Sequence, residues 1–154
     1  MSFEVTKEWI DSVRDISPDV EIGVEYIPEN TDELKHFIAL KVWQRLNDGN
    51  GRAVDDDGNC QYLADDGNKC AVGIFMKDDN PANNCGGNIH GLLNEYEKVV
   101  PNFFDDRQKF LRRFQEIHDD EGSWKDETFI RVDKFIDCCD INNVDSSKIV
   151  ALKS

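Results

Sequence analysis

The stretch VDDDGNCQYLADDGNKCAVGIFM, residues 54–76, decides the fold class of this chain. Asp-Gly occurs in it twice, at Asp57-Gly58 and Asp66-Gly67, and a short apolar-leaning run follows each pair. Asp-Gly between two such runs is typical of a β-hairpin, because a type I′ turn requires positive φ at both central residues. We therefore expect a small antiparallel β-meander over about residues 52–76, with strands at Arg52–Val54, Cys60–Ala64 and Cys70–Phe75.

Amphipathic helices are predicted on both sides of this meander. Apolar residues recur at helical spacing in five segments, which span about residues 5–16, 31–46, 89–99, 105–117 and 123–139. Thr6, Thr31 and Asp105 are the expected N-terminal caps, and Ser123 with Asp126 resembles a capping box. Residues 20–26 alternate between apolar and polar, which predicts a half-buried strand. The sequence thus predicts a single α+β domain over residues 1–154, with the meander packed against several amphipathic helices.

Two details concern the segment spanning residues 31–46. Asn47–Gly51 is expected to end this helix, because glycine and asparagine suit the left-handed conformation at a helix C-terminus. His36 lies beside the apolar stripe, and we expect it at the surface.

The chain is strongly acidic. It carries 18 Lys and Arg residues against 32 Asp and Glu residues, which gives a formal net charge of −14. A nucleic-acid-binding protein would carry a basic stripe, and an anionic membrane would repel this charge, so we expect neither partner. The charge instead fits a basic protein partner, since net charge influences association more than it influences fold.

Three features of the sequence indicate the compartment. Met1–Val5 lacks a basic segment followed by an apolar one, so no signal peptide is expected. No apolar run approaches the ~20 residues that a membrane span requires. The five cysteines are an odd number, which favours free thiols in a reducing cytoplasm over a disulfide framework. We expect a cytoplasmic protein without a cofactor.

The sharpest enzymatic hypothesis joins Cys70, His118 and Asp119. A cysteine nucleophile requires a base within hydrogen-bond reach and a group that orients the base. Cys70 lies in a predicted strand, His118 lies at a predicted helix end, and Asp119 or another acid would be the orienting group. The structural alternative is a buried Cys70 that packs as a small hydrophobe, and a His118 that the helix dipole favours. Both interpretations stay open.

A second hypothesis is a structural zinc site with the ligands Cys60, Cys70, Cys85 and either His90 or His118. The spacing lacks the Cys-x2-Cys pair of zinc knuckles. A two-residue turn would pair Leu63 with Cys70 and place Cys60 and Cys70 on opposite faces, although a one-residue bulge would reverse this placement. Calcium is not favoured either, because Ala53 and Tyr62 stand where an EF-hand loop requires its first oxygen ligand. No metal site is predicted.

Acidic residues concentrate in the predicted turns. If these loops converge, they form one surface that could meet a basic partner or imitate a phosphate backbone, with attraction that weakens as salt rises. The structural alternative is a set of separate, solvated turns. The candidate binding residues are Asp55, Asp56, Asp57, Asp65, Asp66, Asp119, Asp120 and Glu121, with Asp78 and Asp79 nearby in the sequence.

Three segments resemble the pattern of an uncharacterised family of small phage and bacterial proteins. They are Gly58-Asn59-Cys60-Gln61-Tyr62, the run from Asp66 to Gly73, and Ile117-His118-Asp119 followed by Trp124. The family pattern is G-x-C-x-Y, then D-G-x-x-C-A-V-G, an Asp-rich loop and a later I-H-D, and the resemblance covers about residues 40–124. Family members often carry a further cysteine where this chain has Ile74. The resemblance implies a phage or bacterial source and no particular activity.

The sequence therefore favours a small acidic, phage-encoded protein that binds a basic host protein in the host cytoplasm. The alternative is a cysteine-dependent hydrolase or transferase that uses Cys70 and His118, so the sequence leaves open whether the chain is an enzyme. A third hypothesis is a protein that binds a small ligand in a pocket beside the meander.

Overall fold

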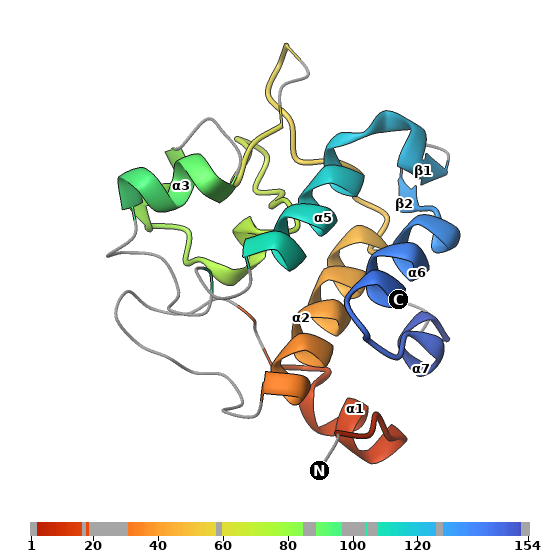
Figure 1. Cartoon of the computed structure of the whole chain (residues 1–154). Coiled ribbons are helices and arrows are strands. Elements are labelled where there is room, and N and C mark those ends of the chain that lie inside the picture. The colour runs from red at the N-terminus through yellow and green to blue at the C-terminus, as the bar shows by residue number, and fades with distance from the viewer. Residues whose placement is uncertain are drawn as a thin grey trace.

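The computed structural model describes residues 3–16, 18, 31–57, 60–84, 89–96, 104, 108–125 and 128–151. Helices dominate the described part of the chain, and a single two-stranded antiparallel sheet accompanies them there (Figure 1). The predicted α+β class is confirmed. The elements are α1 (Lys7–Val13), α2 (Thr31–Leu46), α3 (Ile89–Tyr96), α5 (Gln108–Asp119), α6 (Val132–Ile141), α7 (Ser147–Val150), the 3-10 helices η1 (Gly73–Phe75), η2 (Pro81–Asn84) and η3 (Glu121–Ser123), and the strands β1 (Trp124–Lys125) and β2 (Phe129–Ile130).

Helix α2 is the centre of the core. Nearly every side chain from Leu34 to Leu46 is buried, and α7 and η1 both contact this helix. Helix α5 packs against α3 and α6. Aromatic rings join these helices, because Phe135 of α6 lies 4.9 Å from Trp43 and 5.5 Å from Phe114 between ring centroids. Within the described residues, no helix is both long and apolar enough to cross a lipid bilayer.

Lys41 and Arg45 of α2 are buried as well, and both donate to backbone carbonyls outside this helix. The Lys41 ammonium donates to Val13 O at 2.7 Å and to Arg14 O at 2.9 Å, so it holds the C-terminal end of α1. Burial lowers the pKa of Lys41 to about 8. The Arg45 guanidinium donates to Gly51 O at 2.7 Å and also to Lys69 O, which ties two loops to the end of α2.

The start and end of several elements agree with the sequence-based predictions. The Thr6 hydroxyl accepts the Trp9 N–H at 3.1 Å and caps α1. Helix α2 ends at Leu46, and Gly49 and Gly51 follow with φ values of 88° and 72°. The predicted strand at residues 20–26, the cap at Asp105 and the Asp126 half of the capping box lie outside the described residues.

The predicted meander is reduced to two isolated antiparallel bridges, Val54 with Cys60 and Leu63 with Lys69. The second bridge differs by one residue from the predicted pairing of Leu63 with Cys70. The Gly67 N–H donates to Ala64 O at 2.9 Å and Gly67 has φ of 91°. The connection is therefore a three-residue loop with a left-handed glycine bulge, rather than a two-residue type I′ turn.

The predicted third strand, Cys70–Phe75, is wrong. Residues 73–75 form η1, and the Ile74 N–H donates to Cys70 O at 3.3 Å across the preceding turn. All side chains from Cys70 to Met76 are buried, so the period-2 alternation of a half-exposed strand is absent from this segment.

The prediction of a helix beginning at Ser123 is also wrong. Trp124 pairs with Ile130 and Lys125 pairs with Phe129, which forms the β1–β2 hairpin. Trp124 and Ile130 are buried, whereas Phe129 lies on the other face and is 42% exposed. The helix begins only at Val132. The apolar spacing over residues 123–139 thus combined a period-2 strand with a period-3.6 helix.

His36 is a further correction, because it is buried rather than at the surface. Its Nδ1 lies 2.7 Å from Asp32 O, and its Nε2 accepts the Asp145 N–H at 3.1 Å. The imidazole therefore joins α2 to the segment that precedes α7.

Gly73 provides a test of the close packing at η1. A Cβ at this position would overlap the backbone carbonyl oxygen of Tyr62. We expect Gly73→Ala to lower the free energy of unfolding by about 1–3 kcal/mol or more, because a backbone atom must move to admit the methyl group. Urea denaturation measures this change.

Gly122→Ala is the matched control, because its Cβ would meet only the Asp120 side chain, at 3.3 Å. Equal stability of Gly73→Ala and the unmodified protein would contradict the packing described here.

Candidate functional site

His118 is the central residue of the site. It lies in the last turn of α5 and its side chain is 0% exposed. Its Nδ1 lies 2.8 Å from Asp119 Oδ1, and its Nε2 lies 3.0 Å from the backbone nitrogen of Ala53. The Trp124 indole N–H donates to the His118 carbonyl at 2.9 Å. One residue therefore connects the end of α5, the segment after α2 and strand β1.

The hydrogen-bond partners fix the protonation state of this imidazole. A backbone N–H can only donate, so Nε2 must present its lone pair to Ala53. The proton of the neutral ring is then on Nδ1, which donates it to the Asp119 carboxylate. Burial lowers the pKa of His118, although the hydrogen bond to Asp119 opposes this shift. His118 is a neutral imidazole whose two nitrogens are both engaged.

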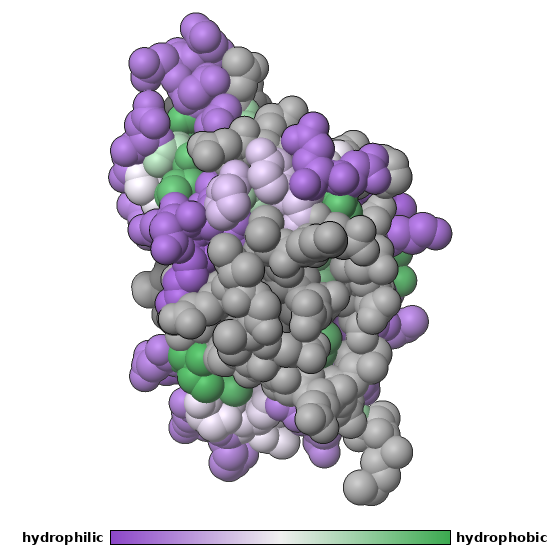
Figure 2. All heavy atoms as spheres, turned by 90° about the vertical axis from the view of Figure 1, so that its left-hand side faces the viewer, coloured by the Kyte–Doolittle hydropathy of each residue, from purple (hydrophilic) through white to green (hydrophobic). Residues whose placement is uncertain are grey.

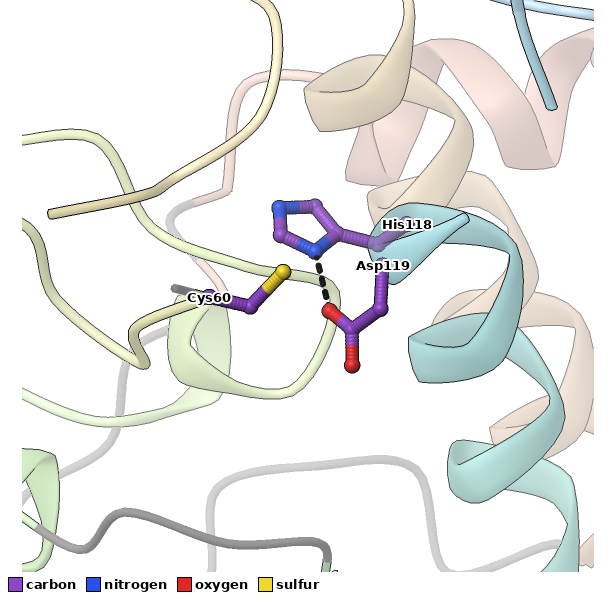
Figure 3. Close-up of side chains that lie close together, drawn as sticks. All are labelled: Cys60, His118 and Asp119. Carbon is purple, nitrogen blue, oxygen red and sulfur yellow. Dashed lines mark hydrogen bonds and ion pairs between the residues drawn. The ribbon is translucent and has the colours of Figure 1, made fainter. Parts of the chain in front are cut away.

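Asp119 and Cys60 complete the cluster at the edge of the protein. The Asp119 side chain is 42% exposed and also accepts a hydrogen bond from Gln115 Nε2 at 2.9 Å. Figure 3 shows Cys60 Sγ pointing toward the paired His118 and Asp119 side chains. One ligand-type atom from each of the three residues lies within 4.8 Å of the others. Arg52 Nη1 lies 3.8 Å from Cys60 Sγ and donates to Asp119 O at 3.2 Å.

The thiols of this region are strongly held in the protonated form. Burial raises the pKa of Cys60 to about 12, and its hydrogen bond to Asp119 acts in the same direction. Burial also raises the pKa of Cys70 to about 11. Cys70 is 0% exposed, and its sulfur accepts the Gly73 N–H at 3.2 Å. Since the thiolate is the reactive form of cysteine, neither residue is an activated nucleophile.

The structure brings together two of the three residues of the enzymatic hypothesis. His118 and Asp119 are hydrogen-bonded, and the cysteine grouped with them within 4.8 Å is Cys60. Cys70 instead bonds Gln115, whose amide donates to Asp119. His118 also has no free lone pair with which to remove a proton from a thiol. The geometry therefore resembles the structural alternative more closely than a cysteine–histidine catalytic pair.

Cys60, His118 and Asp119 offer the sulfur, nitrogen and oxygen donors that zinc uses. A metal on Nδ1 would require the ring proton to move to Nε2, where it would face the Ala53 N–H. A metal on Nε2 would have to displace that N–H from a buried position. The hydrogen-bond geometry therefore does not fit a metal centre. Cys85 and the side chain of His90, two further ligands of the disfavoured zinc hypothesis, lie outside the described residues.

The candidate acidic residues lie in two turns and at the end of α5. Asp55, Asp56 and Asp57 form a turn above the Val54–Cys60 bridge, and Cys60 and Arg52 connect its base to Asp119. Asp120 follows Asp119 directly, and both are exposed. Asp65 and Asp66 are exposed in the second turn, where Asn68 Nδ2 donates to Asn50 O at 3.1 Å. The side chain of Glu121 is not among the described ones.

The sequence suggested Cys60 and His118 together only as zinc ligands, and it did not identify the hydrogen bond from the backbone of Ala53. The sequence pattern contained both halves of the contact, because Cys60 and the Ile117-His118-Asp119 segment belong to the same resemblance. No spacing rule relates residues this far apart, so only the tertiary structure identifies their contact. Comparison with family models, curated proteins and solved structures finds no match for this chain.

Thiol labelling tests the chemistry of the cluster. We expect Cys70 and Cys138 to resist iodoacetamide at pH 8 in the folded protein, because both are buried and burial raises the pKa of each to about 11. Mass mapping after guanidinium denaturation should then show full labelling of both. Rapid labelling of Cys70 in the folded state, with an apparent pKa below that of an ordinary thiol, would support the enzymatic alternative instead.

A second prediction concerns pH. Because the pKa of His118 in the folded protein is below its ordinary value of 6.5, the unfolded chain binds a proton first as the pH falls. The stability that neutral His118 contributes is therefore complete above pH 6.5 and is lost as the pH falls through the folded-state pKa. Urea denaturation between pH 8 and pH 5 should show that the free energy of unfolding decreases as the pH falls. This decrease should be smaller in His118→Gln than in the unmodified protein. Identical slopes for the two proteins would contradict the assigned protonation state.

Proposed function

We propose that this chain is a phage-encoded protein that binds a basic host protein in the host cytoplasm. The contact surface would be an acidic rim formed by the turn Asp55–Asp57 and by Asp119 and Asp120. The net charge of −14 favours approach of a positively charged partner, and exposed carboxylates at a rim mainly raise the rate and selectivity of association.

The observation that carries this proposal is the position of the first acidic turn. Figure 1 shows the segment after α2 extending beyond the helices, and Figure 2 shows hydrophilic side chains gathered at the same end of the molecule. Asp56 and Asp57 are exposed, and no ion pair joins either carboxylate to another described residue. A partner's Lys or Arg side chain can therefore reach these carboxylates without displacing a bond in the fold.

The underlying cluster supports the acidic rim. Asp55 Oδ1 accepts the Asp57 N–H at 3.0 Å, and Asp120 Oδ1 accepts the Gly122 N–H at 3.0 Å. These bonds define the two turns locally, and the contact of Arg52 with Asp119 O joins them. A charged surface with a defined backbone loses less entropy on binding than a flexible tail. The cysteine-dependent alternative has less support, because His118 lacks a free lone pair.

A pull-down with charge variants tests this proposal. We expect a basic protein from a bacterial lysate to be retained by the unmodified chain at low salt and released as salt rises. The triple variant Asp56→Asn, Asp57→Asn, Asp120→Asn should lose that protein, since it keeps the turn hydrogen bonds and removes three charges.

The matched control is Asp133→Asn, Asp137→Asn, Asp140→Asn, which removes three exposed charges from α6. If this control still retains the basic protein while the Asp56, Asp57 and Asp120 variant loses it, the result supports a local binding site. Equal loss in both triple variants, or capture of the same proteins by both, would overturn the proposed surface.

A further inference from the structure

The outward face of α5 is basic, in contrast to the rest of the sequence. Lys109, Arg112, Arg113 and Glu116 recur at helical spacing, so they share one side of the helix, and all four are exposed. The opposite side carries the buried Phe110, Leu111 and Phe114. Three of the 18 basic residues of this chain therefore lie within two turns on one helix face.

These four residues line a surface cavity of about 360 Å³. Sites for small molecules have volumes of about 300–1,000 Å³, so this cavity can admit a compact ligand. A concave wall also concentrates the electrostatic potential of its charged residues more than a flat surface does.

Among the described residues, the positive charge at the cavity is only partly neutralised. Arg112 Nε pairs with Glu116 Oε1 at 3.2 Å. Lys109 and Arg113 have no hydrogen bond or ion pair from their side chains to any described residue. Lys109 stands four positions before Arg113, a spacing at which like charges destabilise a helix by ~0.2–0.5 kcal/mol. An anion bound between them would relieve this repulsion.

Other cations of the fold behave differently. Lys41, Arg45, Lys69 and Lys148 each donate to at least one backbone carbonyl, at the ends of helices or in loops. Those side chains hold segments together and are not available to a ligand. Lys109 and Arg113 have no such structural role in the described part of the chain.

We infer that this cavity on α5 binds a small phosphorylated ligand. Arginine presents a planar set of donors that matches phosphate oxygens in pairs, and lysine adds a mobile point charge. The ligand is small because a long polyanion would also approach the acidic remainder of the molecule. A compact phosphate group instead stays within the ~10 Å Debye length of the three cations. This site is independent of the acidic rim proposed above.

Isothermal titration with inorganic pyrophosphate tests the inference. We expect saturable binding at low salt. We expect the double variant Lys109→Gln, Arg113→Gln to weaken it by at least about tenfold, since both cations that pair with no described residue are lost. The matched control is Lys125→Gln, Lys134→Gln, which changes the net charge equally at residues outside the described cavity lining. It should bind as the unmodified chain does.

Circular dichroism spectra of both double variants test whether they are folded, so that a loss of binding can be assigned to the lost charges. No heat of binding with millimolar pyrophosphate would overturn the inference, and so would equal weakening in the two double variants. A single-stranded oligonucleotide that binds more tightly than pyrophosphate, and is lost with Lys109→Gln, Arg113→Gln, would assign the cavity to a polymer and overturn the small-ligand class.

Discussion

The hydrogen bond from the Ala53 N–H to His118 Nε2 is the contact on which the candidate site depends. It holds the segment after α2 against the end of α5, and the acidic turn and Cys60 are positioned by that segment. If the imidazole were removed, a buried N–H would lose its acceptor, which costs about 1–3 kcal/mol. The same bond occupies the nitrogen that a catalytic base or a metal ligand would need. Stability and chemical inertness of this histidine therefore have one cause.

In this fold, side chains bind many of the backbone N–H and C=O groups that a β-sheet would pair with one another. The described part of the chain has one two-stranded sheet. Its described residues between 47 and 84 are irregular apart from η1 and η2, and their buried backbone groups still require partners. His36 and His118 each accept one backbone N–H, and Arg45 and Lys69 each donate to backbone carbonyls. This explains why a strongly acidic chain buries several of its few basic and imidazole groups.

The sequence predicted those features that depend on local chemistry. The Thr6 cap, the helix at residues 31–46 and its glycine-rich end all follow from short-range rules, and the structure agrees. The failures share a different cause. The Asp66-Gly67 turn supports more than one loop length, and residues 70–76 are buried on all sides, so alternation could not identify their conformation. Cys60 beside His118, and His36 beside Asp145, depend on contacts between distant segments that no local pattern encodes.

Three hydrogen bonds join residues that are far apart in the sequence, and this separation affects the order of folding. Ala53 and His118 are 65 positions apart, His36 and Asp145 are 109 apart, and the Lys148 ammonium donates to Val5 O across 143 positions. Because a ribosome produces the N-terminal segments first, α1 and α2 emerge before any of these three partners exists. Until residues 118–148 are made, water satisfies the groups of Val5, His36 and Ala53 that these later residues bind in the folded protein. Residues 145–148 thus complete contacts of the N-terminal part of the molecule, and these contacts can form only after residues 145–148 have been made.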